Sequence, residues 1–223
     1  MRSAIIAVAA AALVAAAPLK PRQTCYSGLY ILAARGSNEP AGEGDIQEVS
    51  DLITAAVPGS ASIAVDYPAT IFTDGTYVGS VTDGINNAIS LFQSYVDACG
   101  AKSRVVLLGY SQGGNVMTDA LAGGVDKPTP LSTKYTQYLT GVAVFGDPTF
   151  TVGQSFDAGN ATKSGIFSRG GDSLALLSTY APKIRSYCMV HDTVCAFGDS
   201  LDVHYAEVDT FAQAAANFII SLA

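Results

Sequence analysis

Charged side chains are scarce in this sequence, and basic ones especially so. Asp, Glu, Lys and Arg make up only 14% of the 223 residues, and 12 basic residues face 19 acidic ones, for a net charge of −7. The chain has no run of Lys or Arg and no stripe of basic and aromatic residues. Nucleic acid binding relies on such clusters to neutralise phosphates, so we expect no nucleic acid partner.

Long apolar runs are also missing once the N-terminus is passed. Residues 4–17 are apolar but too few to span a bilayer comfortably, and they follow Arg2 and end in three alanines. We interpret residues 1–17 as a secretory signal peptide and residues 18–22 as a short pro-segment that ends at Arg22. The predicted protein is therefore secreted, with no membrane anchor.

Internal repeats and low-complexity linkers are absent as well. The remaining chain is rich in hydrophobic residues, which make up 49% of the whole sequence. A chain of this length and composition can bury one large core. We therefore predict a single catalytic domain over residues 23–223.

Cysteine is infrequent, and its spacing is informative. The chain has four cysteines, and no two form a C-x-x-C pair of the kind that zinc sites use. In a secreted protein an even number of cysteines indicates disulfides, so we predict neither a metal site nor a free thiol. Three pairings are possible among Cys25, Cys99, Cys188 and Cys195.

One glycosylation sequon is present, N-A-T at residues 160–162. It lies in a polar stretch that we expect to be exposed. Asn160 is therefore a predicted N-glycosylation site.

Short apolar runs alternate with helical patterns along the chain. Five runs that end at Gly, Pro or Cys predict buried strands, over residues 28–36, 61–68, 104–109, 141–148 and 183–188. Apolar residues spaced three and four apart predict helices over residues 45–57, 80–99, 115–124 and 208–223. This alternation predicts an α/β fold with three α/β/α layers and a mostly parallel five-stranded sheet. Ligands bind such folds at the carboxyl ends of the strands.

The motif G-Y-S-Q-G lies where the third predicted strand gives way to a helix. Gly-x-Ser-x-Gly at such a turn is a nucleophile elbow, in which bulky neighbours would clash and the serine oxygen projects above the sheet. Ser111 is therefore the candidate nucleophile, between Gly109 and Gly113. The backbone N–H of Gln112, at the start of the helix, is placed to stabilise an oxyanion.

A serine nucleophile needs a general base, and histidine is rare here. The chain has only two histidines, His191 and His204. In folds of this type the order along the chain is Ser, then Asp or Glu, then His. His204 fits that order. His191 would need Asp147 as its acid, and Asp147 reads more simply as a turn residue.

Three aspartates could orient His204, namely Asp192, Asp199 and Asp202. Asp199 and Asp202 lie in a predicted loop close to His204, where geometry is hard to fix, and both also read as solvated surface charges. Asp192 follows the fifth predicted strand and lies between two cysteines. A short disulfide loop there would hold a carboxylate rigidly, as the orientation of a base requires.

Several pieces together resemble a known family. They are Cys25, "ARGSNEP" after the first strand, "YPAT" after the second, "GYSQGG", "FGDP", and "YCMVHDTVC" followed by a histidine. They span most of the chain and resemble the secreted cutinases and acetylxylan esterases, which are mostly fungal and have an α/β-hydrolase fold.

The resemblance implies a triad of Ser111, Asp192 and His204, and a second oxyanion donor at Ser37. It also implies the disulfides Cys25–Cys99 and Cys188–Cys195. It further implies a small monomeric esterase that needs no metal or cofactor and keeps its serine open to solvent. An open serine suits polymeric esters such as cutin or acetylated polysaccharide.

The ester itself is harder to predict. Loops over residues 70–79 and 196–205 should form the rim of the site, with apolar residues that favour an acyl chain or waxy surface. Asp199 and Asp202 make this rim more polar. Cutinase-like hydrolysis of cutin or of short-to-medium acyl esters is the main prediction, acetylxylan deacetylation is the close alternative, and a catalytically silent wall-binding protein on the same scaffold is a third.

Overall fold

The fold is built on one parallel sheet. The computed structural model describes residues 23–71, 73 and 75–223, so the predicted signal peptide and pro-segment lie outside the described residues. The sheet has six strands in the order β2-β1-β3-β4-β6-β5, and every neighbouring pair is parallel. The strands are β1 Tyr30–Ala34, β2 Ala61–Ala64, β3 Val105–Tyr110, β4 Leu139–Phe145, β5 Asp157–Gly159 and β6 Ile184–Cys188.

The central strands are covered on both faces, which explains their unbroken apolar sequences. Every residue of β1 and β3 is buried, and these two strands pair directly, with Ala33 opposite Leu108. Alternate side chains of the two strands enter two different cores. Such double burial favours continuous apolar runs over alternating ones, as the sequence indicated.

The prediction of five strands was one short. The sixth strand, β5, has three residues with the sequence Asp-Ala-Gly and pairs with β6 at the edge of the sheet. It has no apolar run because none of its residues is fully buried. A three-residue edge strand without a fully buried residue leaves little trace in hydrophobic patterning.

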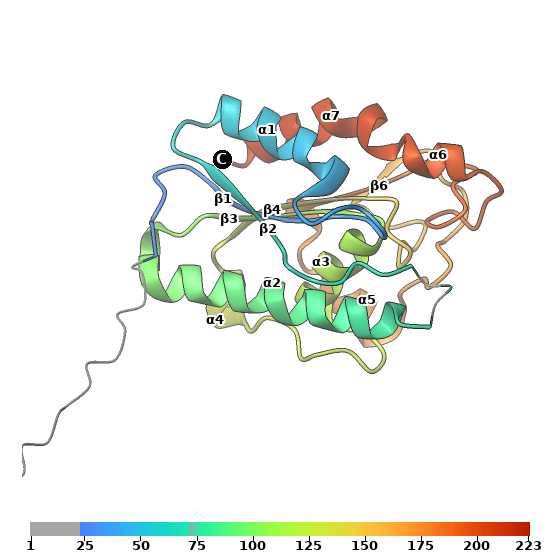
Figure 1. The fold of residues 1–223 in the computed structure, drawn as a ribbon, viewed down its shortest axis with the longest axis horizontal. Coiled ribbons are helices and arrows are strands. Elements are labelled where there is room, and N and C mark those ends of the chain that lie inside the picture. Colours follow the sequence, from blue (N-terminus) through green and yellow to red (C-terminus); the bar gives the residue numbers. More distant parts are fainter. Residues whose placement is uncertain (1–22, 72, 74) are drawn as a thin grey trace, which may run out of the picture.

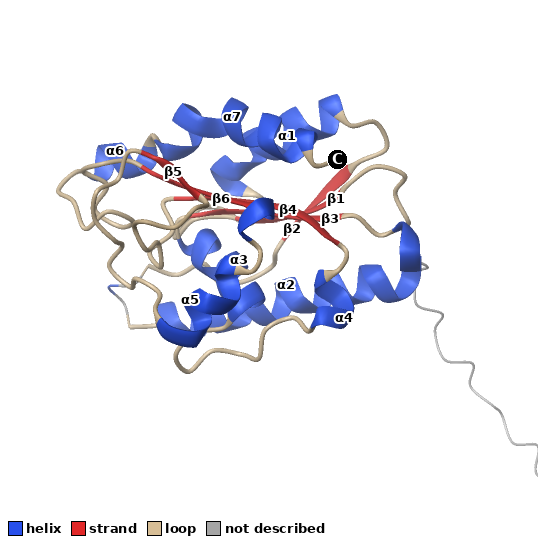
Figure 2. Ribbon diagram, turned by 180° about the vertical axis from the view of Figure 1, so that it is seen from behind, coloured by secondary structure: helices blue, strands red, loops and turns tan. Residues whose placement is uncertain are grey.

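Helices form a layer on each side of the sheet (Figure 1; Figure 2 shows the reverse side). Helices α1 and α7 cover one face, and α2, α3, α4 and α5 cover the other. This is the predicted three-layer arrangement. The α-helices are α1 Gln47–Ala56, α2 Tyr77–Cys99, α3 Gln112–Ala122, α4 Thr133–Thr136, α5 Gly171–Ser178, α6 Leu201–Tyr205 and α7 Glu207–Ser221, with single 3-10 turns η1 Gly44–Ile46, η3 Gly100–Lys102 and η4 Ala181–Lys183.

The strand order changes direction between β1 and β3. From β1 the chain passes to β2 on one side and then to β3 on the other. The loops after β1 and β3 therefore diverge at the carboxyl edge, and such switch points form the ligand crevice of doubly wound sheets. Ser37 follows β1 and Ser111 follows β3, so the topology brings both to this point.

Two disulfides brace the fold, with the pairing that the family resemblance implied. Cys25 is bonded to Cys99, which ties the start of the described chain to the end of α2. Cys188 is bonded to Cys195, which closes a short loop after β6. No helix in the described part of the chain combines the length and hydrophobicity needed to cross a bilayer.

Candidate active site

Ser111 occupies a strained turn between β3 and α3. Its φ of 53° and ψ of −117° lie in a region that residues with side chains rarely adopt. Its N–H donates to the carbonyl of Phe145 at 2.8 Å, which fixes the turn against β4. Strain of this kind persists only where the surroundings enforce it, and it presents the serine side chain above the edge of the sheet.

The two glycines of the motif are required by close packing. A Cβ on Gly109 would lie 2.3 Å from the carbonyl oxygen of Gly113, and a Cβ on Gly113 would lie 2.0 Å from that of Ala34. Both distances are far below any real contact of a side chain. The elbow therefore excludes every larger residue at both positions, as the motif predicted.

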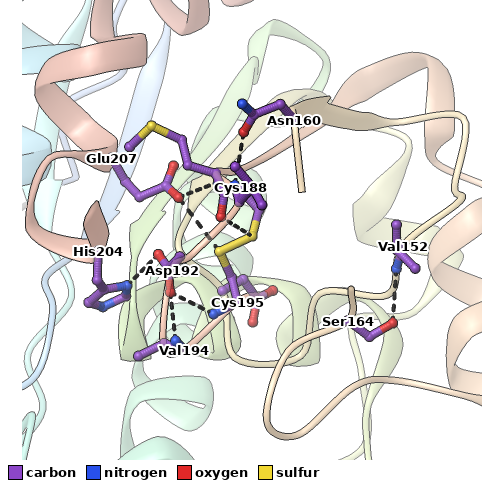
Figure 3. The surroundings of a disulfide bond; sticks show 12 residues. Val152, Asn160, Ser164, Cys188, Asp192, Val194, Cys195, His204 and Glu207 are labelled. Atoms are coloured by element: carbon purple, nitrogen blue, oxygen red, sulfur yellow. Dashed lines mark hydrogen bonds and ion pairs between the residues drawn. A yellow bond between two sulfur atoms is a disulfide. The ribbon is translucent and has the colours of Figure 1, made fainter. Parts of the chain in front are cut away.

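Ser111, His204 and Asp192 form one hydrogen-bonded line. The Oγ of Ser111 lies 2.9 Å from Nε2 of His204, and Nδ1 of His204 lies 2.8 Å from Oδ2 of Asp192. Figure 3 shows the second of these contacts. His204 is 4% exposed and Asp192 is fully buried. These are the contacts that a nucleophile, a base and an orienting acid need.

The imidazole of His204 is held from several sides. It belongs to the short helix α6, which Ser200 caps by accepting a hydrogen bond from the N–H of Val203; the sequence had predicted a loop here. The ring of Tyr110 stacks on the imidazole at 5.2 Å, and its hydroxyl donates to the His204 carbonyl. Below the ring, a Cβ on Gly146 would come within 2.6 Å of Cε1, so only glycine leaves room.

Asp192 lies inside the loop that the Cys188–Cys195 disulfide closes. Its Oδ1 accepts hydrogen bonds from the N–H groups of Val194 and Cys195, which leaves Oδ2 for His204. Burial alone would raise the pKa of Asp192. The hydrogen bond and charge of His204, together with the two N–H groups, outweigh burial and bring that pKa below its ordinary value. The carboxylate therefore stays ionised while it is buried.

The rival residues lie elsewhere. His191 is exposed, and its Nδ1 is 3.0 Å from Oδ1 of Asp199, which is exposed as well. Asp202 is also exposed, in the first turn of α6. Asp147 is buried in a turn and accepts hydrogen bonds from Thr149. Of these four residues, none makes a hydrogen bond with His204 within the described chain.

The candidate oxyanion donors are neighbours. Gln112 is the first residue of α3, so its N–H has no acceptor within the helix. The side-chain amide of Gln112 donates to the hydroxyl of Ser37 at 3.0 Å, which places the loops after β1 and β3 side by side. The N–H of Gln112 thus lies beside Ser111 at the positive end of the α3 dipole, and Ser37 is close to it.

The Gln112 side chain also ties this corner to α2. Its amide donates to the carbonyl of Thr70 at 2.6 Å, and its oxygen accepts from the hydroxyl of Ser80 at 2.7 Å. The Ser80 oxygen in turn accepts from the N–H of Thr70. Because Gln112 and Ser80 are both buried, this network fixes the start of α3 against two other segments.

Glu207 is a second buried carboxyl beside the triad (Figure 3). Its Oε1 accepts from the N–H of Met189 at 2.6 Å and lies 3.6 Å from Sγ of Cys195, while Oε2 is buried with no hydrogen-bond partner in the described chain. Burial raises its pKa to about 8, the Met189 N–H opposes that rise, and the nearby charge of Asp192 adds to it. Glu207 therefore holds a proton in neutral solution. We call Asp192 and Glu207 the disulfide-loop acid pair.

A separate group of buried charges lies along α3. Nη2 of Arg169 is 2.6 Å from Oδ1 of Asp119, with both side chains 3% exposed. Asp147 lies nearby and accepts from Thr118, which also receives a hydrogen bond from Arg169. Burial raises the pKa of Asp119 and of Asp147, and Arg169 opposes both rises. We call Asp119, Asp147 and Arg169 the α3 charge cluster.

No free thiolate is available for a metal in the described chain. Cys188, Cys195 and Glu207 are the one group of three ligand-type residues close enough to share an ion among the described residues. The two sulfurs are bonded to each other, however, and cannot serve as thiolates.

Several apolar residues in the loops predicted to form the rim are exposed. Ile71 is 38% exposed, and Phe72 lies outside the described residues. On the other loop and α6, Phe197, Leu201 and Tyr205 are each more than half exposed. Leu201 is therefore open to solvent over half of its surface, and Ile71 over about a third.

Asn160 is exposed at the end of β5. Its Oδ1 accepts a hydrogen bond from the N–H of Val190 (Figure 3). The predicted glycosylation site thus lies on the surface near the loop that carries Asp192.

Sequence reasoning missed the residues that support the triad. Tyr110 lies within the G-Y-S-Q-G motif, Gly146 within "FGDP", and Glu207 three residues after His204. Proximity to the candidate residues was the signal available for each. Their roles depend on the approach of strands and helices, which periodicity does not encode.

Comparison with known proteins agrees with this geometry. The model of the Cutinase family matches residues 25–223. Cutinase 11 of Verticillium dahliae is 31% identical over 99% of this chain and 77% of its own length. Acetylxylan esterase 2 of Talaromyces purpureogenus is 29% identical over 93% of this chain and 92% of its own.

Solved structures agree as well. The catalytic core domain of the acetyl xylan esterase from Trichoderma reesei superposes with a TM-score of 0.81 at 28% identity, covering 90% of this chain and all of that one. A cutinase-like protein from Cryptococcus sp. shares the fold, with a TM-score of 0.64 at 19% identity over 89% of this chain and 94% of its own. The chain belongs to the Cutinase family of carboxylic ester hydrolases.

Proposed function

We propose that this protein is a secreted serine esterase that cleaves carboxylic esters through an acyl-enzyme on Ser111. The single observation that carries the proposal is the unbroken line from Ser111 Oγ through His204 to Asp192, with contacts of 2.9 and 2.8 Å. It ends at a strained serine on the carboxyl edge of the sheet. A turn that served only to connect β3 to α3 would need neither the strained serine nor its line of hydrogen bonds.

The mechanism follows from the positions of these groups. His204 Nε2 removes the proton of Ser111 as Oγ attacks the ester carbonyl. Asp192 keeps Nδ1 protonated and stabilises the imidazolium that forms. The N–H groups of Gln112 and Ser37 donate hydrogen bonds to the negative oxygen of the tetrahedral intermediate. His204 then protonates the leaving alcohol, and the same residues activate a water that releases the acid.

Cutin or other aliphatic esters of short to medium chain length are the substrates we favour. Ile71, Phe197, Leu201 and Tyr205 give the rim an apolar, exposed surface, which suits an acyl chain better than a hydrated polysaccharide. Ser111 itself is partly exposed. A serine near the surface suits esters within a polymer.

Acetylxylan is the second candidate substrate, for one specific reason. The acetyl xylan esterase core of Trichoderma reesei superposes better, at a TM-score of 0.81, than the Cryptococcus cutinase-like protein does, at 0.64. An acetyl group is the smallest of these acyl groups, so a site that accepts a longer acyl chain would also accept an acetyl group.

We also propose that the chain acts outside the cell as a monomer of one domain over residues 23–223. The apolar residues 4–17 and the two disulfides support secretion. N-terminal sequencing of the secreted protein would test cleavage after residues 17 and 22. Mass spectrometry before and after deglycosylation would test a glycan at Asn160.

Hydrolysis of p-nitrophenyl esters from acetate to palmitate tests the esterase proposal, with Ser111→Ala as the blank. We expect the substitution to lower kcat by about 10⁴ to 10⁶-fold, because nucleophile and base act as a unit. A peak at butyrate or beyond, with release of acids from cutin, would support the aliphatic substrate. Activity confined to acetate and acetylated xylan would support the second candidate. Absence of both activity and fluorophosphonate labelling at Ser111 would leave a silent scaffold.

A further inference from the structure

Glu207 belongs to the same stretch of chain as the candidate base. His204 lies in α6, and Glu207 follows it by three residues as the first residue of α7. Its side chain is fully buried, so it cannot contact a substrate, and no step of the proposed mechanism uses it. The triad thus has a buried carboxyl beside it that takes no part in the chemistry.

This carboxyl contacts both ends of the loop that carries the candidate acid. Oε1 of Glu207 accepts from the N–H of Met189 at 2.6 Å and lies 3.6 Å from Sγ of Cys195 (Figure 3). Asp192 lies midway between these two residues and is bonded to both. Its N–H donates to the carbonyl of Met189 at 3.2 Å, and its Oδ1 accepts from the N–H of Cys195 at 2.8 Å.

Two hydrogen bonds therefore join the same two stretches of chain. The first runs from Nδ1 of His204 to Oδ2 of Asp192 at 2.8 Å. The second runs from the N–H of Met189 to Glu207, three residues further along on one side and three residues back on the other. A single hydrogen bond leaves two segments free to pivot about it. A second one nearby removes that freedom, and active-site side chains are held in this way by the residues behind them.

Packing alone does not call for a carboxyl at this position. Oε2 of Glu207 is buried with no hydrogen-bond partner in the described chain, and an apolar side chain of similar length would fill the space without an unpaired oxygen. Burial, with the charge of Asp192, raises the pKa of Glu207 to about 8. The contact with Met189 is thus made by a neutral group, which adds no repulsion to the buried charge of Asp192.

We propose that Glu207 is a positioning residue for the catalytic acid: its Oε1 holds the disulfide loop so that Oδ2 of Asp192 faces Nδ1 of His204. This inference rests on the proposed function, in which Asp192 orients and stabilises the base. Without the Oε1 contact the loop shifts, and the imidazolium that forms during the reaction loses part of its stabilisation.

Glu207→Met tests the proposal, because methionine has a similar length and accepts no hydrogen bond from Met189. We expect kcat for p-nitrophenyl butyrate to fall about 10- to 100-fold, since small displacements of positioned groups have large effects on rate. KM should change little, because the side chain is buried. The acid limb of kcat/KM should move to lower pH by about 0.5 to 1 unit, because Asp192 stabilises the His204 imidazolium less.

Two further variants show whether the acceptor oxygen is what matters. Glu207→Gln is neutral and keeps this oxygen, so it should restore kcat to within about threefold of the parent. Glu207→Asp withdraws the carboxyl by one methylene and should act in the same direction as Glu207→Met. It decides the matter if the methionine variant does not fold. Equal losses of kcat in the methionine and glutamine variants would overturn the inference.

Ile219→Ala is the matched control for general destabilisation. Ile219 is fully buried on the same helix, α7, and packs close to Gly141 near the amino end of β4, away from the triad. The substitution should lower the free energy of unfolding, measured with denaturant, and leave kcat and the acid limb unchanged. An equal fall in kcat and an equal shift of the limb would overturn the inference and leave the esterase function standing.

Proton NMR tests the geometry without any turnover. In the Ser111→Ala background, the proton on Nδ1 of His204 should give a far-downfield resonance, assigned by its loss in His204→Gln, because it is bonded to a buried carboxylate. Glu207→Met should move it upfield and speed its exchange with water, and Glu207→Gln should restore it. An unchanged resonance in Glu207→Met would overturn the inference. This result is read without ester hydrolysis, so it stands even if the esterase proposal fails.

Discussion

Two groups of buried acids lie near Ser111, and they are stabilised in different ways. In the α3 charge cluster, Arg169 forms a salt bridge with Asp119 and opposes the effect of burial on Asp147. In the disulfide-loop acid pair, the one ion-pair partner in the described chain is His204, on Asp192. Glu207 forms no salt bridge among the described residues and keeps its proton.

The two groups therefore have different roles: the α3 charge cluster stabilises the fold, and the disulfide-loop acid pair supports the triad. In the α3 charge cluster a permanent cation pairs with Asp119 and opposes the effect of burial on Asp147, so the cluster holds α3 and the loop after β4 together. The disulfide-loop acid pair leaves one charged carboxylate for a base that must itself gain and lose a proton. A second ionised carboxyl there would add repulsion in a buried site, and protonation of Glu207 avoids it.

The largest expected effect comes from Asp192→Asn. The amide keeps the shape but donates to Nδ1 where the carboxylate accepted, so His204 is held in the wrong tautomer. We expect kcat to fall by about 10⁴-fold, as for the corresponding change in other triads. Asp199→Asn is the control, because that exposed residue pairs with His191, and it should lower kcat far less. Equal losses in both variants would refute Asp192 as the acid.

Arg169→Met should produce the next largest effect, on stability. It leaves the buried Asp119 without its cation, and loss of one partner of a buried pair costs about 3–5 kcal/mol in the free energy of unfolding. Denaturant unfolding measures this loss. Addition of Asp119→Asn should recover part of it, because the unpaired charge is removed. Lys134→Met, which breaks an exposed pair with Asp97, should change stability little.

Glu207→Gln should have the smallest effect in mildly acidic solution, near the ordinary pKa of 4.5, and an effect that grows as the pH rises. The folded protein holds the Glu207 proton up to a pKa of about 8, against an ordinary value of 4.5. The unfolded chain releases it earlier, so this residue makes stability fall as pH rises from about 4.5 to about 8, with no further change above. Asp192, whose pKa is lowered, contributes in the opposite direction: its stabilisation is lost in acid.

The measurement for Glu207 is the free energy of unfolding across that pH range. Glu207→Gln should flatten the decline, whereas Asp209→Asn, an exposed acid on the same helix, should preserve it. The same slope in the glutamine variant and the parent would show that Glu207 is ionised in the folded protein.

Much of the fold was predictable from patterns that double burial imposes. The runs at residues 28–36 and 104–109 became β1 and β3 because both faces of these strands exclude water. The three-residue β5 and the five-residue α6 were missed, since backbone pairing and a Ser200 cap hold them with little burial. Residue order and chemistry predicted Ser111 and His204 and left three aspartates as candidate acids, of which the family resemblance implied Asp192. They did not predict Tyr110 or Glu207, whose roles require contacts across the sheet edge.

The sequence by itself determined the layered fold, the strained serine turn and the types of residue in the line from Ser111 to Asp192, because each depends on local spacing and chain order. Only the tertiary structure decided which carboxylate meets His204 and which buried acid stays protonated. Those outcomes depend on burial and on distances between distant segments, and both are set when the helices and loops pack together.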